Sequence, residues 1–309
     1  MTSVTEVGPD AAGEVLRIVH EAFAQRPDLD PPSTALDETL ESVTAALSSG
    51  GGLLASHDGR PVGSLLMAPG SGPRGEALVL RRVSVLPDAQ QHGIARMLGS
   101  AAEAAALDRG YDRVQVTARS ELPATVRFWT RGGYAQVAED GTTLTLAKEL
   151  ARSTVVPTAE DMRMLGQRLA THLRPGDLVI LTGDLGAGKT TLTQGLGAGL
   201  GVRGDVTSPT FVISRIHPTL TGGPPLVHVD AYRLGGLAEL DDLDLDVSVE
   251  ESVTVVEWGA GLAETLADDR LQITVGRSSG AGGGTDRRTV RLEPVGARWV
   301  GSGVGSVVA

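Results

Sequence analysis

The segment GDLGAGKT, Gly183 to Thr190, decides the fold of the second half of this 309-residue chain. It satisfies the pattern GxxxxGK[ST] and lies between an apolar run, Leu178–Thr182, and a predicted helix, Thr190–Leu200. A strand, a glycine-rich turn and a helix in this order are the context of a phosphate-binding loop, or P-loop. Glycines let successive backbone amides turn toward phosphate oxygens, and the helix start adds about half a positive charge. The sequence therefore predicts a nucleotide site in an α/β domain.

The residue types of the loop predict distinct tasks. We expect Lys189 to contact the β- and γ-phosphates and the Thr190 hydroxyl to ligate magnesium. The chain has only two lysines, Lys148 and Lys189, and one of them stands where the motif requires it. The predicted ATP-binding residues of this segment are Gly183, Asp184, Leu185, Gly186, Ala187, Gly188, Lys189, Thr190 and Thr191.

Three later segments narrow the chemistry: SPTF (Ser208–Phe211), HVDAYRL (His228–Leu234) and VVEWG (Val255–Gly259). Asp230 and Glu257 end apolar runs, and carboxylates at strand ends beside a P-loop are where a magnesium ligand and a water-orienting group must lie. Each could instead cap a helix or lie at a solvated strand end. Thr210 could sense the γ-phosphate. Phe211, Tyr232 and Trp258 fall inside these segments, and they could pack either around the nucleotide or in the protein core.

These four segments, in this order and spacing, resemble the TsaE-type ATPases of tRNA threonylcarbamoyladenosine biosynthesis over roughly residues 153 to 300. The resemblance implies a P-loop NTPase fold with a three-layer α/β arrangement. It also implies a magnesium-dependent ATPase that binds TsaB and TsaD partner proteins and supports modification of adenosine 37 of tRNA. Family roles then fall on Lys189, Asp230 and Glu257 as catalytic residues, and on Thr190, Asp230 and Glu257 as metal ligands.

The first half shows a different pattern, with helices expected at Ala12–Phe23, Leu36–Leu47, Gly93–Asp108 and Ala124–Arg131. Strands are expected at Gly52–Ser56, Pro61–Ala68, Ala77–Leu86, Val114–Thr117, Tyr134–Val137 and Leu144–Ala147. Asp58 and Gly59 form a dipeptide that is typical of a tight hairpin turn. The order predicts an α/β domain with a mixed, mostly antiparallel sheet that is split by one crossover.

A second anion-binding turn is predicted in this half, within VSVLPDAQQHGIARML (Val83–Leu98). Gln90, Gly93 and Ala95 fit QxxGx[GA], and the amides from Gln91 to Arg96 could meet a pyrophosphate at the helix start. With the later segment FWTRGGY (Phe128–Tyr134), this half resembles the GNAT-type N-acetyltransferases. The resemblance implies an acetyl-CoA site at Val85, Gln90, Gln91, His92, Gly93, Ile94, Ala95 and Arg96, and a protein or small amine as acetyl acceptor.

One residue departs from the acetyltransferase pattern. The aromatic residue after Phe128 is often a tyrosine that acts as general acid, whereas here Trp129 cannot protonate a leaving thiolate. Glu76 and Glu121 are candidate bases, although each could be an ordinary surface carboxylate. Tyr111 and Tyr134 could replace the missing acid.

Length and composition favour two domains, and we expect them at residues 1–150 and 153–309, with the boundary in the weakly periodic stretch Leu150–Pro157. The absence of cysteine excludes a disulfide scaffold, a thiolate zinc site and a cysteine nucleophile. No apolar run approaches 18 residues and the N-terminus lacks a secretory pattern, so we expect a cytoplasmic protein without a membrane span.

The net charge of −11 argues that tRNA is contacted only indirectly, through the complex.

The remaining second-half expectations are helices at Ala159–His172 and Thr190–Leu200 and strands at Leu178–Thr182, Thr210–Ile216, Leu226–Val229, Val253–Val256, Leu271–Val275 and Arg288–Leu292. Between them lie an acidic stretch, Glu239–Glu251, which is either a solvated face or a docking surface, and a glycine-rich loop, Ser278–Gly284. Gly301–Ala309 is expected to be a frayed tail.

Other functions fit the same P-loop. A small-molecule kinase would need an acceptor pocket and a lid that bears arginines, and the region after Trp258 offers no obvious lid. A GTPase would need an Asn-Lys-x-Asp element, which the sequence lacks. The chain could also be a nucleotide-gated interaction module joined to an inactive acetyltransferase-like scaffold.

Overall fold

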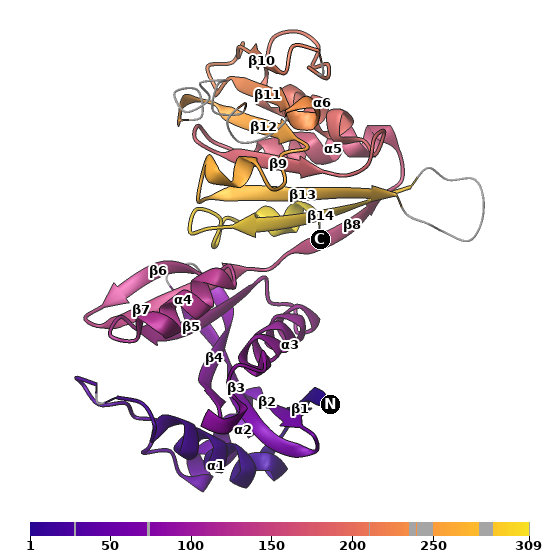
Figure 1. Ribbon diagram of the computed structural model, residues 1–309. Helices are drawn as coiled ribbons and strands as arrows, with labels where there is room; N and C mark the ends of the chain where they lie inside the picture. The colour runs from indigo at the N-terminus through magenta and orange to yellow at the C-terminus, as the bar shows by residue number, and fades with distance from the viewer. Residues whose placement is uncertain are drawn as a thin grey trace. The chain divides into compact units, whose positions relative to one another are not determined.

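The computed structural model describes residues 1–27, 29–72, 75–209, 211–234, 239, 250–277 and 287–308. The chain divides into two compact units, Met1–Leu150 and Ala151–Ala309 (Figure 1). Each unit contains its own mixed sheet of seven strands. No helix in the described ranges is long and apolar enough to cross a membrane.

The sheet of the first unit has the order β1-β2-β3-β4-β5-β7-β6. Its strands are β1 (Thr2–Val7), β2 (Gly52–His57), β3 (Arg60–Gly72), β4 (Gly75–Val85), β5 (Arg113–Arg119), β6 (Ala135–Asp140) and β7 (Thr143–Glu149). Only β4 and β5 run parallel, and the other neighbours are antiparallel, which confirms the mostly antiparallel sheet with one crossover. The predicted turn at Asp58 and Gly59 is also confirmed, because both residues have the positive φ that tight hairpins require.

Four helices complete the first unit: α1 (Ala12–Phe23), α2 (Leu40–Gly50), α3 (Ile94–Asp108) and α4 (Pro123–Arg131). The predicted start of α2 at Leu36 is wrong, because Thr39 begins the helix through a capping box with Ser42. The Ser42 amide donates to Thr39 Oγ1 at 3.1 Å, and the Thr39 amide donates to Ser42 Oγ at 2.9 Å.

The sheet of the second unit has the order β10-β11-β12-β9-β13-β14-β8. Its strands are β8 (Arg152–Val156), β9 (Leu178–Thr182), β10 (Ser214–His217), β11 (Leu226–Asp230), β12 (Val253–Glu257), β13 (Arg270–Arg277) and β14 (Arg288–Val295). The four central strands β11, β12, β9 and β13 are parallel, so their carboxyl ends meet at one edge. β8 lies within the stretch that we expected to be irregular, and β1 was not predicted either.

Both α-helices of the second unit that the structure describes, α5 (Ala159–Ala170) and α6 (Lys189–Leu200), pack on one face of the sheet. They approach closely, because a Cβ on Gly195 would lie 2.1 Å from the Arg163 carbonyl oxygen. The opposite face packs against the short helix η4 (Ala263–Thr265) and its neighbours. The described elements thus form three layers around two apolar clusters.

The end of the chain contradicts the expectation of a frayed tail. Trp299 is fully buried, and the short helix η5 (Val304–Val308) buries Val304 and Val308 in the main apolar cluster. Arg298 fastens this segment by donating to both carboxylate oxygens of Asp177, at 3.0 and 2.9 Å. The glycine- and serine-rich composition concealed these contacts.

The strand predicted from Thr210 begins later, at Ser214. The amides of Val212 and Ile213 both donate to the Pro209 carbonyl, which makes a turn there, and Ile213 has a positive φ of 67°. Thr210, most of the acidic stretch and the loop Ser278–Gly284 lie outside the described residues.

Candidate functional sites

The segment Gly183–Gly188 forms the turn between β9 and α6, at the edge where the parallel strands end. Gly183 has a φ of 148°, and a Cβ there would lie only 2.2 Å from the Val275 carbonyl oxygen on β13. Gly188 caps α6 with a φ of 113°. Both glycines are therefore required by the backbone path, and α6 begins at Lys189 with its free amides directed out of the helix start.

Arg288 on β14 also holds the turn, a role that no motif in the sequence predicts. Its Nε donates to the Ala187 carbonyl at 2.8 Å, and its Nη2 donates to the Gly186 carbonyl at 3.4 Å. The C=O and N–H of one peptide group point in opposite directions. Since the two carbonyls point toward Arg288, the N–H groups of the same peptides, those of Ala187 and Gly188, point away from it. An arginine 101 residues away thus orients the amides of the turn.

Lys189 lies inside the turn and is only 4% exposed. Its ammonium donates to the carbonyls of Gly183 at 2.8 Å and Asp184 at 3.1 Å, and lies 3.8 Å from the Trp258 ring centroid. Burial lowers the pKa of Lys189, although the negative charges of Glu257 and Asp230 oppose this effect. The ammonium is therefore held, partly desolvated, inside the cradle that the turn forms.

Glu257 ends β12 and connects the turn to the neighbouring strand. Thr190 Oγ1 donates to Glu257 Oε1 at 2.9 Å, and His228 Nε2 lies 2.9 Å from the same oxygen. His228 is completely buried on β11, and its Nδ1 has no hydrogen-bond partner among the described residues. Sequence reasoning placed His228 near the site but did not connect it to Glu257, because that contact requires the β11–β12 pairing.

Asp230 ends β11 and is opposite Glu257 in the strand register. Its carboxylate accepts hydrogen bonds from Ser208 Oγ at 3.1 Å and from the Tyr232 amide at 3.1 Å. Asp230 therefore caps the short helix η3 (Ala231–Arg233), and it also draws the segment of Ser208 to the site. Asp230 can therefore cap this helix and still face the site as a metal ligand or water-orienting group, the two roles between which the sequence did not decide.

The donor set at this edge fits magnesium bound together with phosphate. Within the described ranges, no three Asp, Glu or His side chains form a metal site by themselves. The structure does bring together two carboxylates, Asp230 and Glu257, and the Thr190 hydroxyl. Magnesium prefers few protein oxygens and completes its octahedral shell with water and phosphate, so this sparse set suits it.

The other predicted nucleotide residues take different positions. Trp258 has a positive φ of 61°, donates its amide to the Leu181 carbonyl at 2.9 Å, and its ring centroid lies 5.2 Å from that of Tyr232. Leu185, at the tip of the turn, is 80% exposed. Phe211 is 86% exposed, so it does not pack around the turn in this structure.

The second predicted turn, Gln90–Arg96, follows the short helix η2 (Pro87–Ala89) and includes the first residues of α3. Gln91 and Gly93 have positive φ values of 70° and 73°, which produces a concave run of amides at the helix start. The side chains of Gln91, His92 and Arg96 are exposed, whereas Ile94 is buried in the core. A cavity of about 320 Å³ adjoins the turn, and Val83, Val85, Gln90, Ala95 and Phe128 line it.

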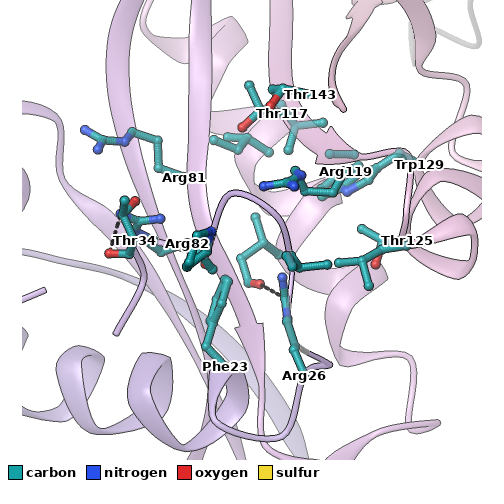
Figure 2. A pocket seen from close by; sticks show the side chains of 18 residues that line it. Phe23, Arg26, Thr34, Arg81, Arg82, Thr117, Arg119, Thr125, Trp129 and Thr143 are labelled. Carbon is teal, nitrogen blue, oxygen red and sulfur yellow. Dashed lines mark hydrogen bonds between the residues drawn. The ribbon is translucent and has the colours of Figure 1, made fainter. Parts of the chain in front are cut away.

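A second cavity, of about 250 Å³, continues from the first and shares Arg26, Val83, Thr125 and Trp129 with it (Figure 2). A bulge in β4 shapes their junction: the register with β3 shifts between Ser64 and Leu66, and Arg82 has a positive φ of 51°. We call this second hollow the arginine cavity, because Arg26, Arg81, Arg82 and Arg119 line it.

The acid and base candidates of the first unit do not converge on these cavities. Glu76 and Tyr111 line a separate hollow near Gly70. Desolvation raises the pKa of Glu121, but the hydrogen bonds from Arg119 and the Asp30 amide outweigh it and lower the pKa, which makes Glu121 a weak base. Tyr134 lies in a third cavity beside Glu103, and burial together with that carboxylate raises the pKa of Tyr134 well above its ordinary value.

Comparisons with known proteins match each unit separately. Residues 156–288 match the family model "Threonylcarbamoyl adenosine biosynthesis protein TsaE", and residues 16–134 match "Acetyltransferase (GNAT) family". The TsaE protein of Streptomyces coelicolor is 62% identical over 149 residues, which are 48% of this chain and 99% of that protein. The TsaE protein of Bacillus subtilis is 39% identical over 49% of this chain and 90% of its own length.

Among solved structures, an N-acetyltransferase from Thermoplasma acidophilum in complex with coenzyme A is 13% identical, with a TM-score of 0.42, over 48% of this chain and 99% of that one. The family models and the curated relatives carry the assignment. Residues 156–288 make this chain a member of the TsaE family, and that domain is fused to an N-terminal GNAT acetyltransferase domain.

Proposed function

We propose that residues 153–309 form a magnesium-dependent ATPase that supports the formation of threonylcarbamoyladenosine at position 37 of tRNA. The observation that carries this proposal is the 2.9 Å hydrogen bond between Thr190 and Glu257, made beside the buried Lys189 ammonium. It joins the start of the P-loop helix to a strand-end carboxylate, which is the arrangement that nucleotide hydrolysis needs.

The residues of the site would divide the work as follows. The amides of Gly183–Thr191 and the Lys189 ammonium bind the phosphates, and Thr190, Asp230 and Glu257 hold the metal or orient a water molecule for attack. Bound magnesium would supply the positive charge that stabilises the phosphoryl group during transfer. His228 fixes the Glu257 carboxylate through the 2.9 Å contact at Oε1.

The surface next to Asp230 supports a role for partner proteins of the TsaB and TsaD types. Phe211, Val212 and Tyr232 are 86%, 57% and 61% exposed, and large apolar side chains that gather on a surface often mark protein contacts. The Arg233 guanidinium lies 4.9 Å from the Phe211 ring centroid, so the patch also carries a positive charge. We propose that tRNA is reached only through this complex, in the cytoplasm.

We propose further that residues 1–150 bind acetyl-CoA and transfer its acetyl group to an amine. The concave amides of Gln91–Arg96 and the adjoining cavity at Val83 and Val85 support this proposal. Trp129 fills the position of the expected acid and packs 4.9 Å from the Tyr134 ring. The leaving thiolate would therefore take its proton from water.

The functional claim for the ATPase domain can be tested in cells by mass spectrometry of tRNA nucleosides. Cells that carry Lys189→Ala in place of the wild type should lose most of their threonylcarbamoyladenosine. Lys148→Ala is the matched control, because Lys148 is the other lysine of the chain and pairs with Glu103 in the first unit. Unchanged threonylcarbamoyladenosine in the Lys189 variant would remove this proposal.

A further inference from the structure

The arginine cavity of the first unit is positively charged. Arg26, Arg81, Arg82 and Arg119 line it, and none of the described residues along its wall is Asp or Glu (Figure 2). The other lining groups are apolar side chains and hydroxyls such as Thr117 and Thr125. Its volume of about 250 Å³ lies below the roughly 300 to 1,000 Å³ typical of drug-sized ligands, so it suits a small molecule.

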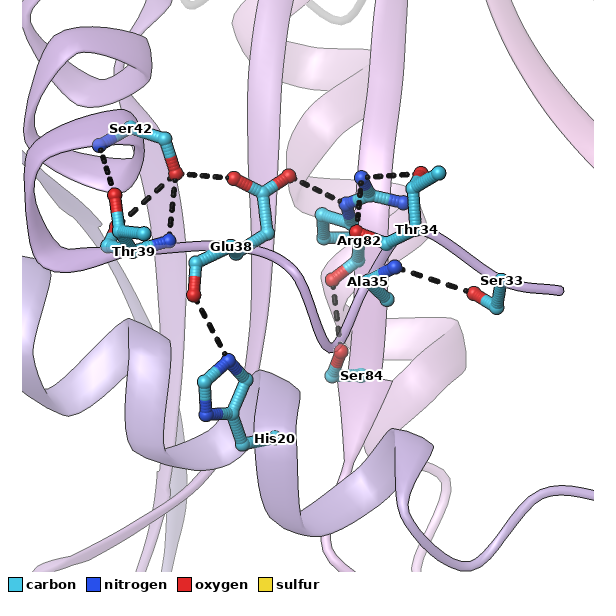
Figure 3. Close-up of polar contacts among 9 residues, drawn as sticks. All are labelled: His20, Ser33, Thr34, Ala35, Glu38, Thr39, Ser42, Arg82 and Ser84. Atoms are coloured by element: carbon cyan, nitrogen blue, oxygen red, sulfur yellow. Dashed lines mark hydrogen bonds and ion pairs between the residues drawn. The ribbon is translucent and has the colours of Figure 1, made fainter.

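Two of these arginines are already neutralised. Arg82 Nε donates to Glu38 at 2.7 Å, and its Nη2 donates to the hydroxyl of Thr34 (Figure 3). Arg119 Nε donates to Glu121 at 2.8 Å, and its terminal nitrogens donate to backbone carbonyls of the loop at Asp30. The carboxylates of Glu38 and Glu121 are thus occupied, and neither Arg26 nor Arg81 forms an ion pair with a described residue, although Glu38 also acts on Arg81 through its charge.

Arg26 has weak local partners for a half-buried cation. Its Nη2 donates to the Val83 carbonyl at a long 3.4 Å, and its guanidinium carbon lies 3.7 Å from the Phe23 ring centroid. Burial lowers the pKa of Arg26, yet arginine stays charged near neutral pH. A partly desolvated cation that has no anionic partner among the described residues is unfavourable, and a bound anion would remove that cost. Figure 2 shows Arg26 and Arg119 pointing into the same space.

We propose that the acetyl acceptor is a small amine that carries a carboxylate or phosphate group, and that Arg26 binds this group while Arg81, at the rim, adds to the attraction. The inference rests on the proposed acetyl transfer. In that step the amine nitrogen forms a bond to the thioester carbonyl carbon and the carbon–sulfur bond breaks. The amine loses one proton to solvent, and the leaving thiolate gains one from solvent.

Coenzyme A is the rival source of an anion for Arg26, since its phosphates are negatively charged. The turn that would bind them contributes Gln90 and Ala95 to the adjoining cavity, and none of its residues lines the arginine cavity. Arg26 lines both cavities. Its position at the junction therefore fits a group that enters from the side opposite the turn, which is the side of the acceptor.

Binding can be measured without turnover in the full chain loaded with coenzyme A. N-acetyl-β-alanine and N-acetyl-β-alaninamide are matched product analogues that differ in the negative charge. We expect calorimetry to show at least about tenfold tighter binding of the anionic analogue, because charge-assisted hydrogen bonds are the strong ones. Arg26→Gln should reduce this preference to about twofold, whereas Arg26→Lys should retain most of it. The affinity for coenzyme A should stay within about twofold.

Two further variants guard against a folding defect at Arg26. Arg81→Gln changes an exposed rim residue and should reduce the preference about threefold. Arg17 forms ion pairs with Glu14 and Glu21 on the same helix. Arg17→Gln should therefore leave the preference for the anionic analogue unchanged. Equal binding of the two analogues, or binding of neither, would overturn the inference.

A transfer assay separates this inference from the proposed activity. Thiol release from acetyl-CoA should be faster with O-phosphoethanolamine than with ethanolamine. If Arg26→Gln weakened only coenzyme A binding, the anion held by Arg26 would be the cofactor's and the inference would be wrong. If the anionic analogue bound through Arg26 but no amine caused thiol release from acetyl-CoA, the proposed anion site would be supported. The proposed acetyltransferase activity would then be wrong.

Discussion

The turn at Gly183–Lys189 and the turn at Gln90–Ile94 bind anions, in our account, with the same backbone device but different side chains. Both follow a strand, contain residues of positive φ and open onto a helix start. The first is surrounded by buried charged groups, namely Lys189, Glu257 and Asp230. At the second turn, the polar side chains of Gln91, His92 and Arg96 are exposed. We therefore propose that backbone amides alone hold a phosphate at the second turn, whereas the buried side chains at the first turn supply the means to cleave one.

The largest expected effect comes from removing the charge inside the first turn. Lys189→Ala should reduce phosphate release from ATP about a thousandfold, because the ammonium would no longer stabilise charge on the phosphates. The fold should survive, since the ammonium contacts only backbone carbonyls and an indole ring. Release should be measured with the TsaB and TsaD partners present. Thiol release by the first unit should not change.

The carboxylate that pairs with Thr190 should matter for the reaction more than for binding. Glu257→Gln keeps a group that can accept the Thr190 hydrogen bond but removes the negative charge. We expect hydrolysis to fall about a hundredfold while the Kd for ATP changes less than fivefold. If the affinity for ATP and the rate of hydrolysis fell by the same factor in this variant, Glu257 would act only in binding ATP.

A smaller effect is expected from the histidine behind that carboxylate. His228→Asn removes the contact to Glu257 Oε1, and losing such support commonly costs about tenfold in activity. The reduction should appear in kcat with KM nearly constant. His217→Asn is the packing control, because that ring is also buried, near His228 and opposite Leu226, but its Nε2 makes no hydrogen bond to any described residue. Equal losses in both variants would indicate a general packing effect.

The smallest effect tests the other side of the comparison. Trp129→Phe should change the rate of acetyl transfer less than about threefold, because the indole has no acid–base role. It should lower the free energy of unfolding by about 1 to 3 kcal/mol, since Trp129 is buried against Phe128 and Tyr134. Thermal unfolding and thiol release measure the two quantities. A hundredfold slower transfer in a folded variant would show that Trp129 takes part in the chemistry.

Local sequence predicted the parts of the fold that local chemistry determines. The P-loop could be read because Gly183, Lys189 and Thr190 stand at fixed spacing within one short motif, although Gly183 and Thr190 also meet distant residues. The two missed strands, β1 and β8, are both at sheet edges. An edge strand buries one face and pairs on one side only, so its sequence carries a weaker hydrophobic signal.

The parts that sequence reasoning missed depend on contacts between distant segments. Arg288 looks like any strand arginine until β14 places it against the turn. Arg26, Arg82 and Arg119 come from the turn after α1, from β4 and from β5, and only folding brings them to one cavity. The buried tail likewise depends on Trp299 and on the Arg298–Asp177 pair, which its glycine-rich composition does not reveal.

We propose that Lys189 and the amides of Gly183–Thr191 bind a triphosphate together with magnesium. Isothermal calorimetry of the full chain with ATP or ADP, with and without magnesium, measures this binding. We predict one nucleotide per chain, binding that weakens when magnesium is removed, and little or no binding by Lys189→Ala. Absence of nucleotide binding by the folded wild-type protein in the presence of magnesium would contradict the account.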